Sequence, residues 1–144
     1  FALLAIHFTG IIINYVTPKG LEMPQDIKDY LKLHNIPQHE YRSIEDVIKY
    51  SDVVYMTRIQ KERFESQDEY LKYKGGYILT SQIMSMAKEK MIVMHPLPRI
   101  DEIEKNIDFD PRCAYFRQMV YGMYTRMALL LLTLGPYEQD KNIH

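Results

Sequence analysis

The sequence predicts an α/β fold in which helices flank one doubly wound, parallel β-sheet. Short apolar runs rich in Ile, Val and Met lie at residues 11–16, 52–57 and 91–94, as is typical of strands covered on both faces. Segments with helical periodicity and capping signals alternate with these runs, which favours parallel strands joined by helices. At 144 residues, the chain has the length of one domain rather than two.

The segment before residue 43 predicts one strand and one helix. Residues 11–16 are β-branched and continuous, and Thr17-Pro18-Lys19-Gly20 turns the chain after them. Pro24 suits the first turn of a helix. Apolar side chains then recur at helical spacing until Asn35 and Pro37 end the pattern, so a helix is expected between these limits.

A second helix and strand are predicted next. Ser43 begins the helix, with Asp46 three residues later as an acidic variant of the capping box. Residues 52–57 form the strand. Residues 65–76 are strongly polar, rich in Tyr and closed by Gly75-Gly76, and this composition predicts a surface loop or lid.

A third helix and strand are predicted after this loop. Thr80 can cap the helix, which reaches Ala87. Residues 91–94 return as a strand. This strand is followed by the histidine and proline motif discussed below.

A long helix is predicted at the end of the chain. Asp110 and Pro111 are a cap and first-turn pair, and Gly135 stops the helix after Leu134. Gly122 is a candidate for a break or bend within it. Residues 127–134 are apolar nearly all round, so we expect them to be buried against another surface.

Composition narrows the class of protein. With 18 basic and 19 acidic residues, the net charge is -1, and no basic stripe indicates nucleic-acid binding. The longest apolar run is far shorter than the ~20 residues that cross a bilayer. No signal peptide is recognisable, which favours a cytoplasmic protein. The chain opens at Phe1 without Met, and we interpret it as a piece of a longer protein.

Neither a metal nor a cofactor is predicted. The single cysteine, Cys113, cannot form a disulfide within the chain, and we interpret it as a buried structural thiol, with a reactive thiol as the alternative. His7, His34, His39 and His144 show no metal-ligand spacing. The glycine-rich phosphate loops of nucleotide-binding proteins are absent from the sequence.

Two motifs begin where predicted strands end, and together they indicate one small-molecule site. Residues 56–64 read Met-Thr-Arg-Ile-Gln-Lys-Glu-Arg-Phe, and residues 95–99 read His-Pro-Leu-Pro-Arg. In open parallel sheets, ligands bind outside the carboxyl ends of the strands. Arg58 offers a rigid fork of donors to a carboxylate or phosphate, and Gln60 can add a neutral partner. The alternative is that Arg58 forms a salt bridge with Glu62 or Glu65.

The second motif predicts a stiff backbone. Pro96 and Pro98 flank Leu97, and prolines both restrict the chain and lack an N–H group. Such a loop presents carbonyl oxygens rigidly, which suits it to accept hydrogen bonds from an amide or amine. The alternative is a stiff turn that binds no ligand.

These motifs resemble those of aspartate carbamoyltransferase, over nearly the whole chain. The matching segments, including two long motifs at the centre, are 14–16, 21–24, 55–64, 95–103, 115–118 and 126–130. The amino-acid sequence near Asp110-Pro111-Arg112 is similar to that of the aspartate carbamoyltransferases fused into eukaryotic multifunctional pyrimidine proteins. The resemblance implies one domain of a two-domain carbamoyltransferase, with residues 1–134 as an amino-terminally truncated aspartate-binding domain and residues 135–144 as a tail.

The resemblance also implies roles for single residues. Arg58 would bind a carboxylate of L-aspartate, and Gln60 would assist. The backbone at Pro96, Leu97 and Pro98 would contact the carbamoyl group of carbamoyl phosphate and the incoming amine. Arg63 would support closure of the site, and the loop at residues 65–76 would cover it. No cofactor is implied.

The resemblance further implies that half of the site is missing here. The family's phosphate-binding Ser-Thr-Arg-Thr segment belongs to an amino-terminal domain, on which the last helix packs, and the family assembles as a homotrimer. We therefore expect a chain that takes part in pyrimidine biosynthesis but is inactive alone. The alternatives are a non-catalytic scaffold of the same fold, or ornithine carbamoyltransferase, which Pro96 disfavours because that enzyme has cysteine there.

Overall fold

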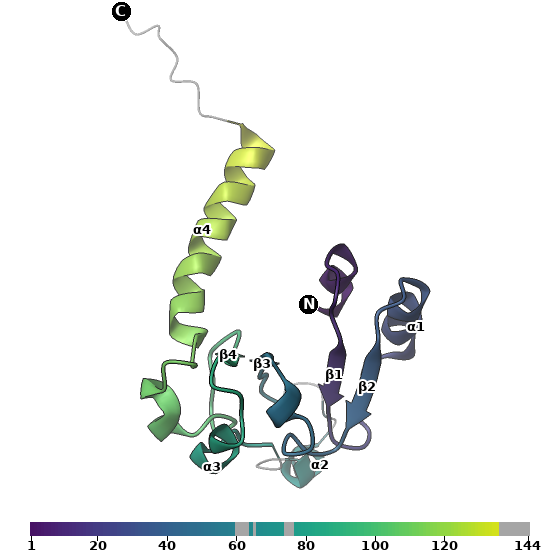
Figure 1. Cartoon of the computed structure of the whole chain (residues 1–144), viewed down its shortest axis with the longest axis vertical. Helices are drawn as coiled ribbons and strands as arrows, with labels where there is room; N and C mark the ends of the chain where they lie inside the picture. Colours follow the sequence, from purple (N-terminus) through teal and green to yellow (C-terminus); the bar gives the residue numbers. More distant parts are fainter. Residues whose placement is uncertain (60–63, 65, 74–76, 136–144) are drawn as a thin grey trace, which may run out of the picture.

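The computed structural model describes residues 1–59, 64, 66–73 and 77–135, and this part of the chain holds four strands (Figure 1). β1 (Ile13–Val16) pairs in parallel with β2 (Gln38–Tyr41). β3 (Val53–Tyr55) pairs in parallel with β4 (Ile92–Met94). The predicted α/β class with parallel strands is therefore confirmed.

The strands form two hydrogen-bonded pairs rather than the single ladder that was expected. In the view of Figure 1 the strands follow one another in the order β4, β3, β1, β2. Stacking of Phe1 on Tyr55, with ring centroids 5.3 Å apart, joins the segment before β1 to β3. After β1 the chain forms β2 on one side of β1, and it then crosses to form β3 on the other side of β1 (Figure 1). Such a reversal is the place where doubly wound folds bind ligands.

The predicted first helix is confirmed, and the second prediction is wrong. α1 (Gln25–Leu33) follows Pro24, and a short 3₁₀ helix, η1 (Ala2–His7), packs against it. After Ser43 the chain makes a turn and then only the 3₁₀ helix η2 (Ile48–Tyr50). The Ser43 hydroxyl accepts the Glu45 N–H at 3.2 Å, so the cap closes a tight turn instead of starting an α-helix.

Two elements between β1 and β4 differ from the sequence prediction, and one confirms it. β2, which the sequence did not predict, consists of Gln-His-Glu-Tyr, and none of its residues is buried. Part of the expected polar loop is a helix, α2 (Gln67–Tyr73). α3 (Ser81–Ser85) confirms the predicted cap, because the Thr80 hydroxyl accepts the Ile83 N–H at 3.2 Å.

The last helix, α4 (Tyr115–Leu134), begins later than predicted. Asp110 instead ends the 3₁₀ helix η4 (Lys105–Phe109), and its carboxylate accepts the Arg112 N–H at 2.9 Å. The helix runs through Gly122 without the predicted break. Gly135 ends it with a φ of 75°, a conformation that favours glycine.

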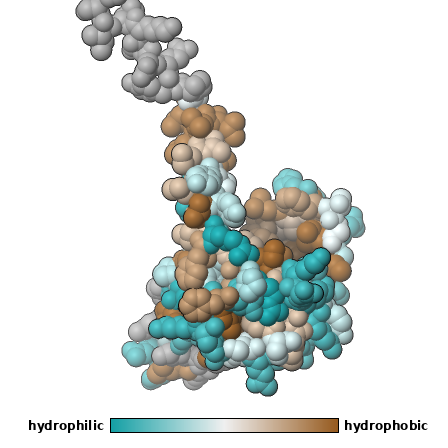
Figure 2. Space-filling model, turned by 60° about the vertical axis from the view of Figure 1, so that its left-hand side comes forward, coloured by the Kyte–Doolittle hydropathy of each residue, from teal (hydrophilic) through white to brown (hydrophobic). Residues whose placement is uncertain are grey.

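The apolar half of α4 is exposed on this chain, and the described residues do not provide the surface against which it was expected to be buried. Only the first turn of α4 packs against β4, and the rest of the helix projects from the body of the molecule (Figure 1). Leu132 is 83% exposed and Leu134 is 76% exposed. Figure 2 shows the resulting apolar surface along the helix. Within the described residues, no helix is long and apolar enough to cross a bilayer.

The hydrophobic core lies around β3 and β4, beneath the strand ends that carry the two motifs. Its buried side chains come from η2, β3, α3, β4, η4, the start of α4 and the segments that connect these elements: Ile48, Val54, Leu79, Ile83, Met84, Met91, Val93, Ile103, Ile107, Cys113 and Tyr115. The prediction that Cys113 is buried is confirmed, and burial raises the pKa of its thiol. Parallel bridges from Leu79 to Ile103 and from Val93 to Cys113 extend this core toward the loops.

Two leucine substitutions test where the core lies. Leu79→Ala removes a fully buried side chain and should lower the free energy of unfolding by about 2–5 kcal/mol. Leu132→Ala on the exposed part of α4 should change it by less than about 0.5 kcal/mol. Urea unfolding of the two variants beside the unsubstituted chain measures both values. Equal losses would contradict the assignment of the core.

The exposed surface of α4 should make the chain bind hydrophobic dyes and self-associate, because an apolar patch of this extent is unstable in water. Replacing Leu131 and Leu134, which are 62% and 76% exposed, by glutamate should reduce both effects. Dye fluorescence and light scattering at several concentrations measure them. A monomer that binds no dye would contradict this expectation.

Candidate functional site

The two predicted motifs lie at adjacent strand ends. Tyr55 is in register with Met94, and the Met56 N–H donates to the Met94 carbonyl at 2.9 Å. Arg58 follows β3 by three residues and is half-buried. Arg58 and the loop that His95 opens therefore follow neighbouring strands at the same end of the pair.

Arg58 lines a small hollow formed by three segments of the chain. The lining residues are Thr57, Arg58, Ile59, Tyr70, Tyr77, Ile78, Ile100, Asp101 and Glu102. The hollow measures about 30 Å³, which suffices for a water molecule but not for an amino acid. An anion could thus approach Arg58 at this rim only as part of a larger site.

Several predicted residues fall outside the described ranges. Gln60 and Arg63 lie there, as do Glu62 and Glu65, the alternative partners proposed for Arg58. Of the first motif, the described part therefore supports the position of Arg58 at the strand end.

His95 is the buried anchor of the second motif. Its side chain is fully buried, and its backbone N–H donates to the Gln118 side-chain carbonyl of α4 at 3.1 Å. The Leu97 N–H donates to Nδ1 of His95 at 2.8 Å, so Nδ1 carries a lone pair. These contacts assign the ring proton to Nε2, which lies 2.7 Å from Oε1 of Glu102.

Glu102 closes the loop from its other end. Its second carboxylate oxygen, Oε2, accepts the backbone N–H groups of Ile100 and Asp101 at 3.1 and 3.2 Å. Burial alone raises the pKa of this carboxyl group, but hydrogen bonds from backbone N–H groups and from His95 outweigh it and lower the pKa. Glu102 is therefore held as a carboxylate, and it clamps residues 95–102 into one rigid loop.

The backbone between these anchors has the rigidity that its prolines predict. Leu97 has a φ of 52°, and the Leu97–Pro98 peptide bond is cis. Pro96 and Pro98 are exposed, and Leu97 is half-buried. Within the described residues, none of their three carbonyl oxygens accepts a hydrogen bond. They are therefore available as acceptors, and their contact with a ligand stays a prediction.

Arg99 fixes the loop to the core rather than offering a charge to the site. Its guanidinium donates to both carboxylate oxygens of Asp108 and to the Tyr115 hydroxyl at 3.2 Å. The Arg99 guanidinium lowers the pKa of the Asp108 carboxyl group, and burial raises the pKa of the Tyr115 hydroxyl. Arg99 is therefore bound within the body of the molecule. Arg58 is the cation among the residues that line the hollow.

Sequence reasoning missed three residues of this site. Glu102 and Gln118 occur within matching segments but were given no role, and Tyr77 was not singled out. The sequence carries no signal for Glu102, because Asp101, Glu104 and Lys105 are charged as well and nothing in the pattern shows which of these side chains is buried.

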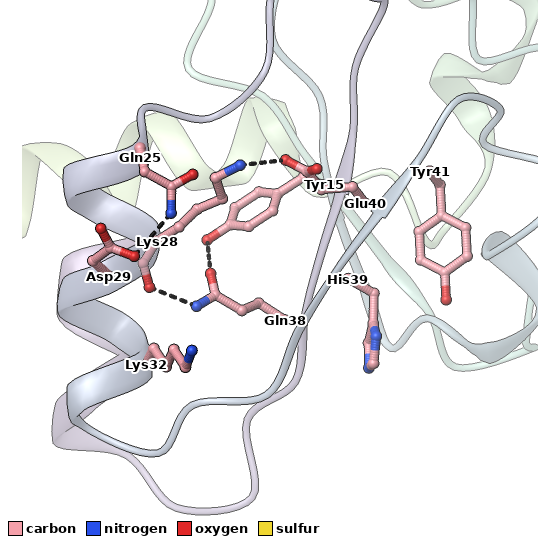
Figure 3. Close-up of a pocket in the computed structure, with 9 residues that line it drawn as sticks. All are labelled: Tyr15, Gln25, Lys28, Asp29, Lys32, Gln38, His39, Glu40 and Tyr41. Atoms are coloured by element: carbon pink, nitrogen blue, oxygen red, sulfur yellow. Dashed lines mark hydrogen bonds and ion pairs between the residues drawn. The ribbon is translucent and has the colours of Figure 1, made fainter.

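A larger hollow of about 560 Å³ lies between α1 and β2, away from both motifs. Figure 3 shows that several of its polar side chains point toward one another, whereas His39 and Tyr41 point away from them. They form three pairs: Lys28 with Glu40, Gln25 with Asp29, and Tyr15 with Gln38. These pairs engage six of the nine lining residues, and Lys32, His39 and Tyr41 belong to none of them. In the described ranges, no group of three His, Cys, Asp or Glu residues could hold a metal ion.

The chain is similar in sequence to one known protein family. Residues 2–133 match the family model of the aspartate/ornithine carbamoyltransferase, Asp/Orn-binding domain. The chain is 52% identical over 125 residues to the multifunctional protein CAD of Squalus acanthias, covering 87% of the chain and 6% of that protein. It is 50% identical over 130 residues to an aspartate carbamoyltransferase catalytic subunit of Clostridium botulinum, covering 90% of the chain and 42% of the subunit.

Solved structures agree. The catalytic subunit of aspartate transcarbamoylase from M. jannaschii superimposes with a TM-score of 0.80 at 41% identity, over 94% of this chain and 44% of that subunit. The Trypanosoma cruzi enzyme in complex with carbamoyl phosphate and aspartate gives 0.75 at 44% identity, over 83% and 40%. The chain thus spans less than half the length of each of these relatives.

The Glu102 clamp predicts a specific pH dependence. Its lowered pKa stabilises the fold above the unfolded pKa of about 4.3, and this contribution is lost as pH falls from there through the folded pKa. Glu102→Gln should lower the free energy of unfolding at pH 7 by about 1–3 kcal/mol. It should also flatten the decline in stability that begins near the unfolded pKa of about 4.3 and continues as pH falls, as measured by urea unfolding.

The matched control is Glu89→Gln, because Glu89 is exposed. It should leave both the stability at pH 7 and its pH dependence unchanged. If the Glu102 and Glu89 variants behave alike, the buried clamp does not contribute to folding.

Proposed function

Because the chain belongs to the aspartate/ornithine carbamoyltransferase family, we propose that it is the L-aspartate-binding half of an aspartate carbamoyltransferase. The whole enzyme would form N-carbamoyl-L-aspartate and phosphate from carbamoyl phosphate and L-aspartate, a step of pyrimidine biosynthesis. The observation that supports this proposal is that Arg58 and the loop at Pro96–Pro98 follow two paired parallel strands, β3 and β4. One offers a cation, and the other offers free carbonyl oxygens.

Arg58 would bind a carboxylate of L-aspartate. Its guanidinium matches the two carboxylate oxygens in a bidentate fashion, and it lines the rim of the hollow after β3. Gln60, two residues further along, would add a neutral hydrogen bond. Arg63 would support the closed arrangement of the segment that follows.

The carbonyl oxygens of Pro96, Leu97 and Pro98 would hold the amide of the carbamoyl group and the incoming amine. The amine nitrogen of aspartate then forms a bond to the carbamoyl carbon while the bond from that carbon to the phosphate oxygen breaks. The proton that the amine loses passes to the departing phosphate or to solvent, and phosphate leaves. The substrate is an activated mixed anhydride, so fixed orientation of the two reactants can contribute up to roughly 7–11 kcal/mol.

The phosphate of the substrate requires a second half of the site. The sequence contains no glycine-rich phosphate loop, and Arg58 is the cation that lines the hollow. We propose that an amino-terminal domain supplies the phosphate-binding donors and covers α4, and that the complete enzyme is a cytoplasmic homotrimer. The apolar surface of α4 supports such a docking.

Activity of the chain joined to an amino-terminal half tests this proposal. The chain alone should form no carbamoyl aspartate, whereas the chain fused to the amino-terminal half of the C. botulinum relative should form it. In the fusion, Arg58→Ala should lower kcat/KM for aspartate roughly ten- to a hundredfold, because a charged hydrogen bond contributes about 1.5–3 kcal/mol. A radioactive or colorimetric assay of carbamoyl aspartate measures these rates.

Lys49→Ala is the control, since Lys49 lies on η2 outside the hollow and packs over the Tyr50 ring. It should retain full activity. Unchanged turnover in the Arg58 variant would instead favour a non-catalytic scaffold. Carbamoylation of ornithine in preference to aspartate would favour ornithine carbamoyltransferase.

A further inference from the structure

Tyr77 forms a wall of the hollow beside Arg58 and is anchored from outside it. Its side chain lines the hollow together with Arg58 and Tyr70. Its hydroxyl donates to the backbone carbonyl of Arg42 at 2.8 Å. The ring is thus held at both ends, by its own backbone and by a residue 35 positions earlier in the chain.

Arg42 is itself fixed at the carboxyl ends of β1 and β2. It directly follows β2, and its Nη1 donates to the Thr17 carbonyl, just after β1, at 3.0 Å. Its Nη2 lies 2.8 Å from Oε1 of Glu22. The other oxygen of Glu22 accepts the Gly20 N–H at 2.8 Å. One guanidinium therefore joins β2 to the loop that follows β1.

The same loop also meets α2. Gly20 has a φ of 94°, and a Cβ atom there would lie 3.3 Å from the Tyr73 hydroxyl. Tyr73 packs on Phe64 with ring centroids 5.6 Å apart. The loop after β1 therefore contacts the end of α2 through Tyr73, while Arg42 contacts Tyr77. The first contact reaches α2, which carries Tyr70, and the second reaches Tyr77. Tyr70 and Tyr77 both line the hollow.

We propose that Tyr77 is a positioning residue for aspartate binding, and that Arg42 and Glu22 act through it. The hydroxyl bond holds the ring as a fixed wall, so the space beside Arg58 has a defined width when the substrate carboxylate arrives. Without this bond the ring moves, and part of the binding energy of aspartate is used to order it again. This inference rests on the proposed function of Arg58.

The test uses steady-state kinetics of the active fusion with Tyr77→Phe, which keeps the ring and removes the hydroxyl. The KM for aspartate should rise about two- to tenfold, the range that one neutral hydrogen bond gives. The kcat and the KM for carbamoyl phosphate should stay within twofold. Glu22→Gln should raise the KM for aspartate less, and the double variant should fall short of the product of the two effects.

Tyr50→Phe is the matched control, because Tyr50 is 66% exposed and its hydroxyl forms no hydrogen bond with the described residues. A wild-type KM for aspartate in Tyr77→Phe would overturn the inference while leaving the proposed function intact. An equal rise in both KM values together with a lower Tm would also overturn it, since that indicates general loosening. Absence of turnover in the unsubstituted fusion would overturn the proposed function and this inference together.

Discussion

The buried contact between His95 and Glu102 is the interaction on which the rest of the site depends. The ring takes one proton position because Leu97 donates to Nδ1, and that position lets Nε2 donate to Glu102. The carboxylate in turn holds two backbone N–H groups. A charge enclosed in this way is costly unless every lone pair is used. The loop therefore has a strong preference for one shape, and its outer carbonyls keep fixed directions.

The sequence predicts those elements whose hydrophobic pattern reflects their burial. It does not predict elements that form because of the neighbouring segments they contact. β3 and β4 are apolar because their central residues are fully or nearly buried, and they were recognised. β2 has no buried residue, so its sequence carries no strand signal, although it pairs fully with β1. The start of α4 was misplaced because Asp110 has the right side chain for a cap but uses it on Arg112 in a turn.

The site divides in a similar way. Arg58 and the loop at Pro96–Pro98 were predictable, since strand ends, prolines and a guanidinium are visible in the sequence and their resemblance to a family is specific. Glu102 and Tyr77 were not, because their roles consist of contacts with His95 and Arg42 that arise only when distant segments meet. Gln60 and Arg63 stay predictions, as they lie outside the described residues. The roles proposed for Arg58 and for the loop at Pro96–Pro98 stay predictions as well. Sequence motifs thus suggest which groups would meet a substrate, and folding supplies the groups that hold them in place.

The chemistry of the two motifs also argues for a second, complementary surface. Carbonyl oxygens are acceptors with partial negative charge, so the loop at Pro96–Pro98 suits an amide or amine but repels a phosphate. Arg58 has a planar fork suited to one carboxylate, and Arg99 is engaged by Asp108 inside the body. A doubly charged phosphate needs several donors on the opposite side of the carbamoyl group. In the proposed function, the face presented by this chain would therefore orient the nucleophile and the carbamoyl carbon, and the surface that meets it would stabilise the leaving phosphate.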